Sequence, residues 1–551
     1  MARPVHRTFT GGRGVSVARL RTAAAAVLVW CALVAPDRLA LLTPGAFVRL
    51  PLEGLLALAV LLLLPRRTRA VASVVAGLLL ALLVLVKVLD IGFVEALGRP
   101  FDPWSDWSYG GPAVGLLVDS VGHSGAVLVL VGTALLAVAV LLALPLSVVR
   151  LATSAARHRA GALRTIAVLG AAWLLCAVLG VQVLPDAPVA STSAARLVYD
   201  HLHQLRVDVH DEQSFAHAVA DDRFRDTPAD RLLRGLRGHD VVVAFVESYG
   251  RVALEDPGIS APVDDALDTG TARLREAGFS ARSAFLDSPT FGGLSWLAHS
   301  TLQTGLWIDD QQRYQRVVAG DRLTLSDAFG RAGWRTVADV PSNGSSWPTG
   351  RSFYHYDKLY NAWNVGYAGP SYSYATMPDQ YTLAAFERSE LARRPRRPVM
   401  AEIDLVSSHT PWTPLPRPVP WDEVGNGSVY AGLPPRGPAP DVLWRDPERV
   451  RRAYARSITY SLDTVVSFLR TYGRRDHGNL VVVLLGDHQP ATVVSGPGAS
   501  HQVPVTVIAQ DPAVLARISG WGWQDGLRPG RDAPVWPMDA FRDRFLAAYA
   551  R

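Results

Sequence analysis

Long, almost uninterrupted apolar stretches fill the first third of the chain and then stop. Each is long enough to cross the ~30 Å hydrocarbon core of a bilayer, which takes roughly 20 helical residues. Further spans follow the first stretch, so it is not a cleavable signal peptide. We therefore expect an all-α, five-helix transmembrane domain over residues 1–184. The five predicted spans cover approximately residues 22–42, 47–65, 70–89, 124–149 and 164–184.

The pattern changes after residue 236, where short continuous apolar runs alternate with segments of helical length. Runs without polar alternation are typical of parallel strands that are buried on both faces. Strands that alternate with helices predict an α/β/α sandwich with a mostly parallel sheet, here over residues 236–551. Residues 185–235 are expected to form a linker and a juxtamembrane helix. The predicted strands are Val241–Val246, Ala281–Leu286, Arg335–Val340, Val399–Leu405, Leu480–Leu485 and Val503–Ile508.

Composition agrees with this division. Hydrophobic residues make up 49% of the chain, which excludes an ordinary soluble enzyme. The first 184 residues hold 16 Lys and Arg against seven Asp and Glu, a net charge of +9, whereas the whole chain carries +6. This basic excess flanks the spans and does not line a soluble face, so no nucleic-acid partner is expected. Both cysteines, Cys31 and Cys176, lie in predicted spans, which excludes a thiolate zinc cage in the soluble part.

The arginines also predict the topology. They gather before the first span, between the second and third spans, and between the fourth and fifth. The positive-inside rule places these segments in the cytoplasm. The chain is therefore expected to be a multi-pass plasma-membrane protein with a cytoplasmic N-terminus and an extracytoplasmic domain after residue 185. Lys87 and Asp90, near the outer end of the third span, are expected to snorkel to the interface.

Polar residues follow the predicted strands. Glu247 comes directly after the first strand, and Asp487 and His488 come at the end of the fifth. Thr290 follows the second strand in the segment SPTFGG, and His501 precedes the sixth. Ligands bind at the carboxyl ends of strands in open α/β sheets. Carboxylates and imidazoles are ligands for Zn²⁺ or Mn²⁺, so we expect a metal site at this edge.

In this order the segments FVESYG, SPTFGGLSWLAHSTLQTG, SSHTPW, LLGDHQP and SHQVPV resemble the membrane-anchored, sulfatase-like members of the alkaline phosphatase superfamily. The layout is similar to that of lipoteichoic acid synthases and lipid-linked phosphoethanolamine transferases. The resemblance implies an alkaline phosphatase-like fold. It also implies one divalent metal, Mn²⁺ or Zn²⁺, held by Glu247, Thr290, Asp487 and His488, with Thr290 as the nucleophile.

The resemblance implies further roles. His409 would contact the phosphate or join Asp404 and His501 in a possible second metal site. Trp347, Arg351 and Tyr354 stand where such synthases bind the anionic headgroup. His299 instead matches no role and is expected to be a packing or surface residue. Arylsulfatases need Cys/Ser-x-Pro-x-Arg around the nucleophile, which this chain lacks.

The chemistry of these residue types agrees with the resemblance. A threonine hydroxyl becomes a competent nucleophile when a cation favours its alkoxide. If Thr290 starts a helix, backbone N–H groups would also face the phosphoryl oxygens. The implied function is transfer of a phospho-alcohol headgroup from a membrane phospholipid to a cell-envelope glycan or lipid through a phospho-threonine. The alternatives are a membrane-bound hydrolase that uses water and, less favoured, an inactive envelope sensor.

Overall fold

The computed structural model describes residues 11–184, 187–372, 374–393, 395–472 and 479–550. Arg3 and Arg7, two of the arginines that precede the first predicted span, lie outside these ranges. The chain forms two compact units. The helical unit comprises residues 1–95 and 99–210, and the α/β unit comprises residues 96–98 and 211–551. The expected linker is largely a helix, α6 (Ser193–Ala220), within which the two units divide.

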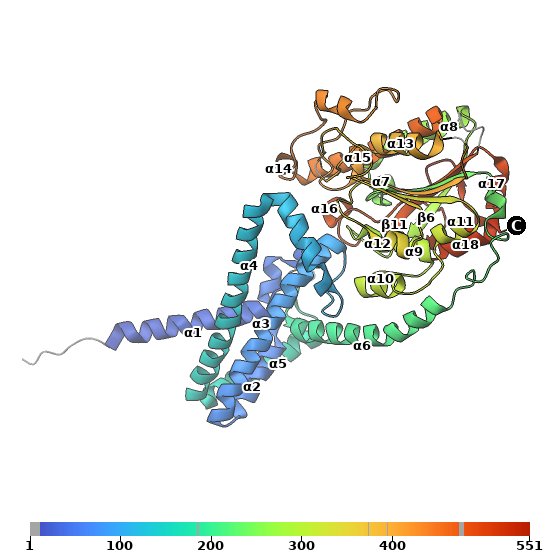
Figure 1. Ribbon diagram of the computed structural model, residues 1–551. Helices are drawn as coiled ribbons and strands as arrows, with labels where there is room; N and C mark the ends of the chain where they lie inside the picture. Colours follow the sequence, from blue (N-terminus) through green and yellow to red (C-terminus); the bar gives the residue numbers. More distant parts are fainter. Residues whose placement is uncertain (1–10, 185–186, 373, 394, 473–478, 551) are drawn as a thin grey trace, which may run out of the picture. The chain divides into compact units, whose positions relative to one another are not determined.

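The helical unit contains four helices that are long and apolar enough to cross a membrane, within the described residues. Figure 1 shows its helices in blue to green. The second predicted span, 47–65, is a 12-residue helix preceded by a 3-10 turn over Pro44–Val48. At 1.5 Å per residue that helix covers only about 18 Å. The helices are α1 (Gly11–Val34), α2 (Leu52–Leu63), α3 (Arg66–Leu97), α4 (Gly110–Arg157) and α5 (Arg159–Leu179).

The bounds of the spans differ from those predicted from hydropathy. The first ends at Val34 and not near residue 42, because 3-10 turns follow it. The third and fourth continue well beyond their apolar stretches, to Leu97 and to Arg157. A helix continues while its backbone hydrogen bonds continue, whereas a hydropathy window ends where polar side chains begin.

The α/β unit is built on one mixed sheet, in which nine strands of the described residues take part. The strand order is β12-β6-β11-β10-β5-β9-β7-β8, and β13 pairs with β6. The five strands from β10 to β8 are parallel, whereas β11 is antiparallel to both β10 and β6. The strands are β5 (Asp240–Val246), β6 (Ser280–Asp287), β7 (Arg335–Val340), β8 (Lys358–Asn361), β9 (Val399–Leu405), β10 (Leu480–Gly486), β11 (Gln502–Ala509), β12 (Gln524–Asp525) and β13 (Val535–Pro537).

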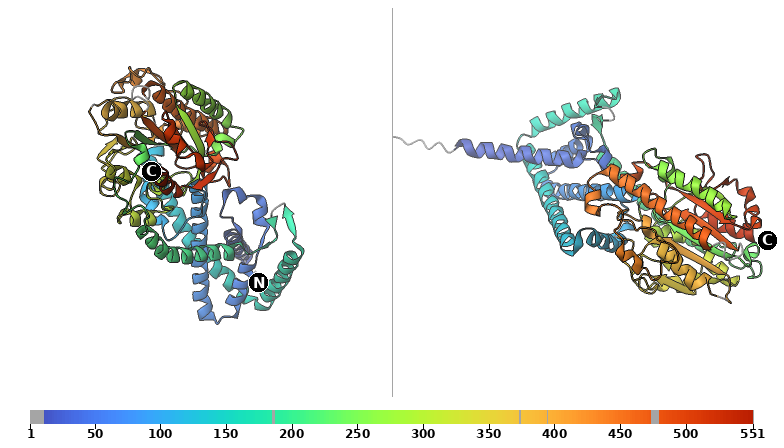
Figure 2. Two further views of the ribbon diagram at one scale, coloured as in Figure 1. Left: turned by 90° about the vertical axis from the view of Figure 1, so that its right-hand side faces the viewer. Right: turned by 90° about the horizontal axis from the view of Figure 1, so that it is seen from above.

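Helices cover both faces of this sheet, as Figure 1 shows. One face packs against α8 and α15, which lie side by side in Figure 2. The other face packs against α9, α11 and α18. The expected α/β/α sandwich is therefore confirmed. The helices of this unit are α7 (Val252–Glu255), α8 (Ser260–Glu276), α9 (Ser295–Thr304), α10 (Gln311–Val318), α11 (Leu325–Arg331), α12 (Pro348–Ser352), α13 (Asp379–Phe386), α14 (Pro440–Leu443), α15 (Pro447–Tyr472), α16 (Thr492–Ser495), α17 (Pro512–Ala516) and α18 (Ala540–Tyr549).

Candidate metal centre

Strand register brings the first group of polar residues together. In the parallel ladder Val246 pairs with Gly486 on one side and with Leu405 on the other, so β5, β10 and β9 end at one level. Glu247 and Asp487 are the next residues after two of these ends. A glycine is needed at position 486, because the segment after β5 passes so close that a Cβ there would lie 2.0 Å from the carbonyl oxygen of Tyr249.

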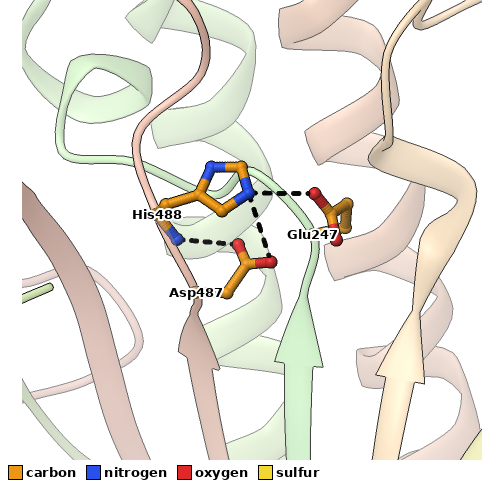
Figure 3. Close-up of side chains that lie close together, drawn as sticks. All are labelled: Glu247, Asp487 and His488. Atoms are coloured by element: carbon orange, nitrogen blue, oxygen red, sulfur yellow. Dashed lines mark hydrogen bonds and ion pairs between the residues drawn. The ribbon is translucent and has the colours of Figure 1, made fainter. Parts of the chain in front are cut away.

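Glu247, Asp487 and His488 form a compact cluster (Figure 3) in which one ligand atom from each lies within 4.8 Å of the others. His488 Nε2 is 3.2 Å from Glu247 Oε1 and 3.6 Å from Asp487 Oδ2. Asp487 Oδ1 accepts hydrogen bonds from two backbone N–H groups, those of Ser248 and His488, both at 2.8 Å. These bonds fix the carboxylate and leave Oδ2 facing the imidazole.

The orientation of the His488 ring shows what this cluster requires. Its Nδ1 lies 2.7 Å from the carbonyl oxygen of Gln489, which can only accept, so Nδ1 carries the proton. In the neutral ring, Nε2 then carries no proton, and its lone pair faces the carboxylates of Glu247 and Asp487. Either a proton or a metal cation has to stand between these atoms. Metal-binding histidines commonly have this arrangement, in which a hydrogen bond from one ring nitrogen sets the tautomer and leaves the other nitrogen to bind the metal.

The charges in the cluster support the same conclusion. Burial works against ionisation of Glu247, but His409 and His488 hold the pKa of its carboxyl well below the usual range. Burial and the charge of Glu247 raise the pKa of Asp487 to about 6. Burial alone would lower the pKa of His488, yet Asp487 and Glu247 raise it to about 9. A site that attracts a proton this strongly also attracts a divalent cation in its place.

Thr290 lies beside this cluster in the loop that joins β6 to α9. Ser288 Oγ donates to the carbonyl oxygen of Asp487 at 2.5 Å, and the N–H of Gly292 donates to that of Gln489 at 2.9 Å. These bonds fasten the loop along the segment that carries both ligands. Thr290 Oγ1 is buried and has no hydrogen-bond partner, and the same is true of Asp487 Oδ2. Both oxygens are therefore buried acceptors that no hydrogen bond of the described residues satisfies.

The helix expected to begin at Thr290 begins five residues later, at Ser295. The idea that a helix N-terminus faces the phosphoryl group at Thr290 is therefore wrong. Ser295 has a different role, because its Oγ donates to Glu247 Oε2 at 3.1 Å and lies 3.2 Å from His488 Nε2. This residue was not predicted. The sequence shows only that Ser295 lies three residues after Gly292, and this spacing does not by itself indicate a contact with Glu247 or His488.

The two remaining predicted histidines flank the cluster. His409 Nδ1 lies 2.6 Å from the carbonyl oxygen of Thr410, so Nε2 is its free nitrogen. Burial lowers the pKa of His409, which favours the neutral ring, and Glu247 acts on it in the opposite direction. His501 Nδ1 is 3.3 Å from the carbonyl oxygen of Ser288, which places it next to the loop of Thr290.

Asp404 belongs to a second cluster with two residues that the sequence did not suggest. His299 Nδ1 lies 3.3 Å from Glu402 Oε1 and 3.5 Å from Asp404 Oδ1. The ring of His299 stacks on Phe245 with centroids 3.7 Å apart. His299 is thus a paired, half-buried residue and not only a packing or surface residue. In the described part of the chain no hydrogen bond or ion pair joins Asp404 to His409 or His501.

The three residues expected at the headgroup are separated by burial. Trp347 and Tyr354 pack together with ring centroids 5.4 Å apart. Tyr354 is 3% exposed, and its hydroxyl lies 2.7 Å from Ser300 Oγ on α9. Arg351, on α12, is exposed. Of the three, Arg351 is exposed and Trp347 is half-buried, whereas Tyr354 belongs to the core.

Comparison with known proteins gives structural neighbours only. No protein family and no curated protein matches the chain. The integral membrane lipooligosaccharide phosphoethanolamine transferase A of Neisseria meningitidis is 12% identical, covers 97% of this chain and 95% of its own, and has a TM-score of 0.46. A lipoteichoic acid synthase of Listeria monocytogenes is 14% identical, covering 57% and 74%, with a TM-score of 0.36.

The phosphoglycerol transferase GacH of Streptococcus pyogenes, solved with sn-glycerol-1-phosphate, is 12% identical and covers 61% and 91%, with a TM-score of 0.34. The proteins of Neisseria meningitidis and Listeria monocytogenes carry the names of the two groups that the sequence motifs resemble. Because all three TM-scores are below 0.5, the chemistry of this chain has to be argued from its own residues.

Proposed function

We propose that this protein is a metal-dependent transferase that moves a phospho-alcohol headgroup from a membrane phospholipid to a cell-envelope glycan or lipid. The observation that carries the proposal is the His488 ring, whose lone-pair nitrogen faces Glu247 and Asp487 beside the unpartnered hydroxyl of Thr290. Four apolar helices in the same chain favour a donor that resides in the membrane.

The metal would be held by Glu247, Thr290, Asp487 and His488, with Mn²⁺ or Zn²⁺ as the candidates for this donor set. When bound, such an ion supplies positive charge that lowers the pKa of a coordinated hydroxyl and neutralises the transferring phosphoryl group. The chain itself fixes the geometry through the two backbone bonds to Asp487, the Gln489 carbonyl and the hydroxyl of Ser295.

In the first half-reaction Thr290 Oγ1 loses its proton and forms a bond to the lipid phosphorus. The bond from phosphorus to the diacylglycerol oxygen breaks, and that oxygen takes up a proton. Neutral His409 suits this transfer, since Nε2 is free to accept the threonine proton and pass it to the leaving oxygen. The products are diacylglycerol and a phospho-threonine diester.

In the second half-reaction an acceptor hydroxyl attacks the same phosphorus. Its proton is passed to Thr290 Oγ1 as the threonine–phosphorus bond breaks, which regenerates the enzyme. His501, next to the loop of Thr290, is a second group placed to carry this proton. If water takes the place of the acceptor, the same residues act as a hydrolase. The possible second metal site of Asp404, His409 and His501 is not used in this scheme.

The test is turnover of fluorescent phosphatidylglycerol and phosphatidylethanolamine by the full chain in vesicles, followed as diacylglycerol release. Thr290→Ala should abolish release. Its affinity for the metal, measured by titration with a competing chelator, should stay within about tenfold of the wild-type value. Thr290→Ser keeps a hydroxyl and should retain part of the activity. Full turnover by Thr290→Ala would contradict the proposed nucleophile. Release without transfer to any added glycan or lipid would favour the hydrolase.

We further propose that the α/β unit lies outside the cytoplasm. The arginines of the α2–α3 turn and of the α4–α5 turn support this orientation through the positive-inside rule. A reporter that is active only outside the cytoplasm should be active when fused after residue 200. Activity of the same reporter at the α2–α3 turn alone would invert the topology.

A further inference from the structure

The helical unit contains a groove that the proposed chemistry does not use. It has a volume of about 710 Å³, within the roughly 300–1,000 Å³ typical of small-molecule sites. Residues of α1, α2, α3, α4 and the first part of α6 line it. The lining is apolar almost throughout, for example at Leu58, Leu83 and Val198, and only Glu53 and His201 carry ionisable groups.

The α6 side of the groove is a regular stripe. Ala194, Ala195, Val198, His201 and Leu202 all line it, a spacing that places them on one face of a helix. The polar helix after the last span therefore contributes an apolar face to the membrane-type helices within this same unit.

One end of the groove is polar. Glu53 is in the first turn of α2, at the end opposite the arginines of the α2–α3 turn. Its Oε1 accepts a hydrogen bond from the N–H of Ala195 at 2.9 Å. Its Oε2 is buried and has no hydrogen-bond partner. An unpaired carboxylate oxygen away from water is unfavourable, so this atom calls for a donor.

The neighbouring polar groups have partners within the protein. Lys87 Nζ donates to the carbonyl oxygens of Ala32 and Leu33 at the end of α1, both at 3.1 Å. His201 Nε2 lies 3.2 Å from Asp90 Oδ2, and Asp90 Oδ1 accepts from the N–H of Phe101. Lys87 and Asp90 are therefore buried and paired, and the expectation that they snorkel is wrong. Among the ionisable groups that line the groove in the described residues, Glu53 presents the unpaired atom.

We propose that this groove binds one acyl chain of a glycerophospholipid whose headgroup donates a hydrogen bond to Glu53 Oε2. The occupant follows from the lining: apolar helices of membrane-spanning length surround the groove, and its polar end offers an acceptor. An ethanolamine ammonium and a glycerol hydroxyl are both donors, whereas the choline headgroup has no N–H or O–H. The lipid class is thus phosphatidylethanolamine or phosphatidylglycerol in preference to phosphatidylcholine. This inference concerns binding and goes beyond the proposed transfer reaction.

The test uses the full chain with Thr290→Ala, so that bound lipid is not consumed. The protein is equilibrated in vesicles with equal amounts of palmitoyl-oleoyl phosphatidylethanolamine, phosphatidylglycerol and phosphatidylcholine, and then purified in detergent. Mass spectrometry measures the lipid retained per chain. We expect phosphatidylethanolamine or phosphatidylglycerol to be retained over phosphatidylcholine by about tenfold, the ratio that one charge-assisted hydrogen bond supplies. Equal retention of all three lipids would overturn the proposal.

Matched variants locate the lipid. Ala57 lines the groove, whereas Ala139 is an equally exposed alanine on α4 that does not. Ala57→Trp should fill the groove and remove the retained lipid, and Ala139→Trp should leave it; equal effects would place the lipid elsewhere.

Glu53→Gln keeps one side-chain oxygen to accept from the N–H of Ala195, and it puts an NH₂ group in place of the free acceptor Oε2. The lipid should still be retained, but the preference for phosphatidylethanolamine or phosphatidylglycerol over phosphatidylcholine should be lost. That variant decides the question even if Ala57→Trp does not fold. Because no turnover is involved, failure here is distinct from failure of the transferase.

Discussion

Two clusters at the carboxyl end of the sheet each combine a histidine with two buried carboxylates, yet they differ in which ring nitrogen faces the acids. In the metal centre His488 turns Nε2 to Glu247 and Asp487, because Nδ1 is committed to the Gln489 carbonyl. In the second cluster His299 turns Nδ1 to Glu402 and Asp404. A neutral His299 can donate from that nitrogen, whereas a neutral His488 cannot.

The two clusters also differ in their other partners. Glu402 Oε2 accepts from the hydroxyl of Tyr356 at 2.9 Å and from Gln303 Nε2. Within the described residues, the Glu247 carboxylate accepts hydrogen bonds from the hydroxyls of Ser248 and Ser295 and forms an ion pair with His488. Glu402 is therefore satisfied by hydrogen bonds from the protein, although Asp404 Oδ1 and His299 Nε2 in the same cluster are buried without a hydrogen-bond partner. In the candidate metal centre, Asp487 Oδ2 is buried without one. Equal numbers of acids and histidines do not make equal metal sites, because the second hydrogen bond of the imidazole decides what the first nitrogen can accept.

The largest expected difference is between Asp487→Asn and Glu402→Gln. Asp487→Asn removes a proposed ligand and should lower turnover by at least about a thousandfold, since the ion supplies several kcal/mol of transition-state stabilisation. Glu402→Gln should keep the metal and most of the activity. Elemental analysis and lipid turnover check both. Loss of a second metal equivalent in Glu402→Gln would show that the second cluster is also a metal site and would break the comparison.

Asp339 lies on β7, the strand next to β9, and is a buried carboxyl group without a hydrogen-bond partner. Burial and the charge of Asp404 raise the pKa of Asp339 to about 8, and neither oxygen has a hydrogen-bond partner. The folded state therefore keeps a proton that the unfolded chain releases near its ordinary value of 3.8. Stability should fall as pH rises between these values, by up to about 1.4 kcal/mol per pH unit, and should not fall further above pH 8.

Asp339→Asn has no such proton to lose. Its melting temperature relative to the wild type should therefore increase from pH 5 to pH 8, with unfolding free energies that differ by about 4 kcal/mol at most over this window. Differential scanning fluorimetry in detergent measures this. Parallel curves for the two proteins would mean that Asp339 is already ionised when the protein is folded.

Tyr356→Phe removes one donor to Glu402 without changing the size of the ring. A hydrogen bond to a buried charged group contributes about 1.5–3 kcal/mol, so the melting temperature should fall while the metal content stays the same. Phe353→Leu is a control that changes the same apolar cluster without touching Glu402. A change in metal content specific to Tyr356→Phe would couple the two clusters.

Ser295→Ala is the matching change at the metal centre and the smallest effect expected. It removes the hydroxyl that contacts Glu247 and His488 but no ligand. Removal of such a supporting group typically lowers metal affinity by about 10–100-fold. Titration with a competing chelator measures the affinity, and the melting temperature of the metal-free protein should barely move. Unchanged affinity would show that Ser295 does not support the site.

Much of the fold followed from the sequence. All six apolar runs are strands, and α15 has the residues expected at a helix start, with Pro447 in its first turn and Asp446 accepting from two N–H groups of that turn. The strands β8, β12 and β13 were missed, because segments of two to four residues have no readable pattern. The antiparallel direction of β11 was missed as well, since a buried run has the same composition in either direction.

The metal centre was predicted because its members follow strand ends, where backbone geometry places side chains at the edge. The second cluster was missed because Glu402 lies inside a strand and His299 inside a helix, positions that hydropathy assigns to the core. One signal was available: Glu402 and Asp404 are two residues apart in a buried run, so they share a face that has to provide a positive partner.

The sequence by itself determined the apolar spans, the strands and the types of ligand at the strand ends, because these follow from local composition and periodicity. Only the tertiary structure decided which acids share a histidine, which nitrogen each histidine presents, and that the second span is short. Those features depend on register between segments far apart in the chain, such as the bond from the N–H of Ser248 to Asp487, which spans 239 residues. Local patterns do not encode that register, since it is set by the packing of the whole sheet.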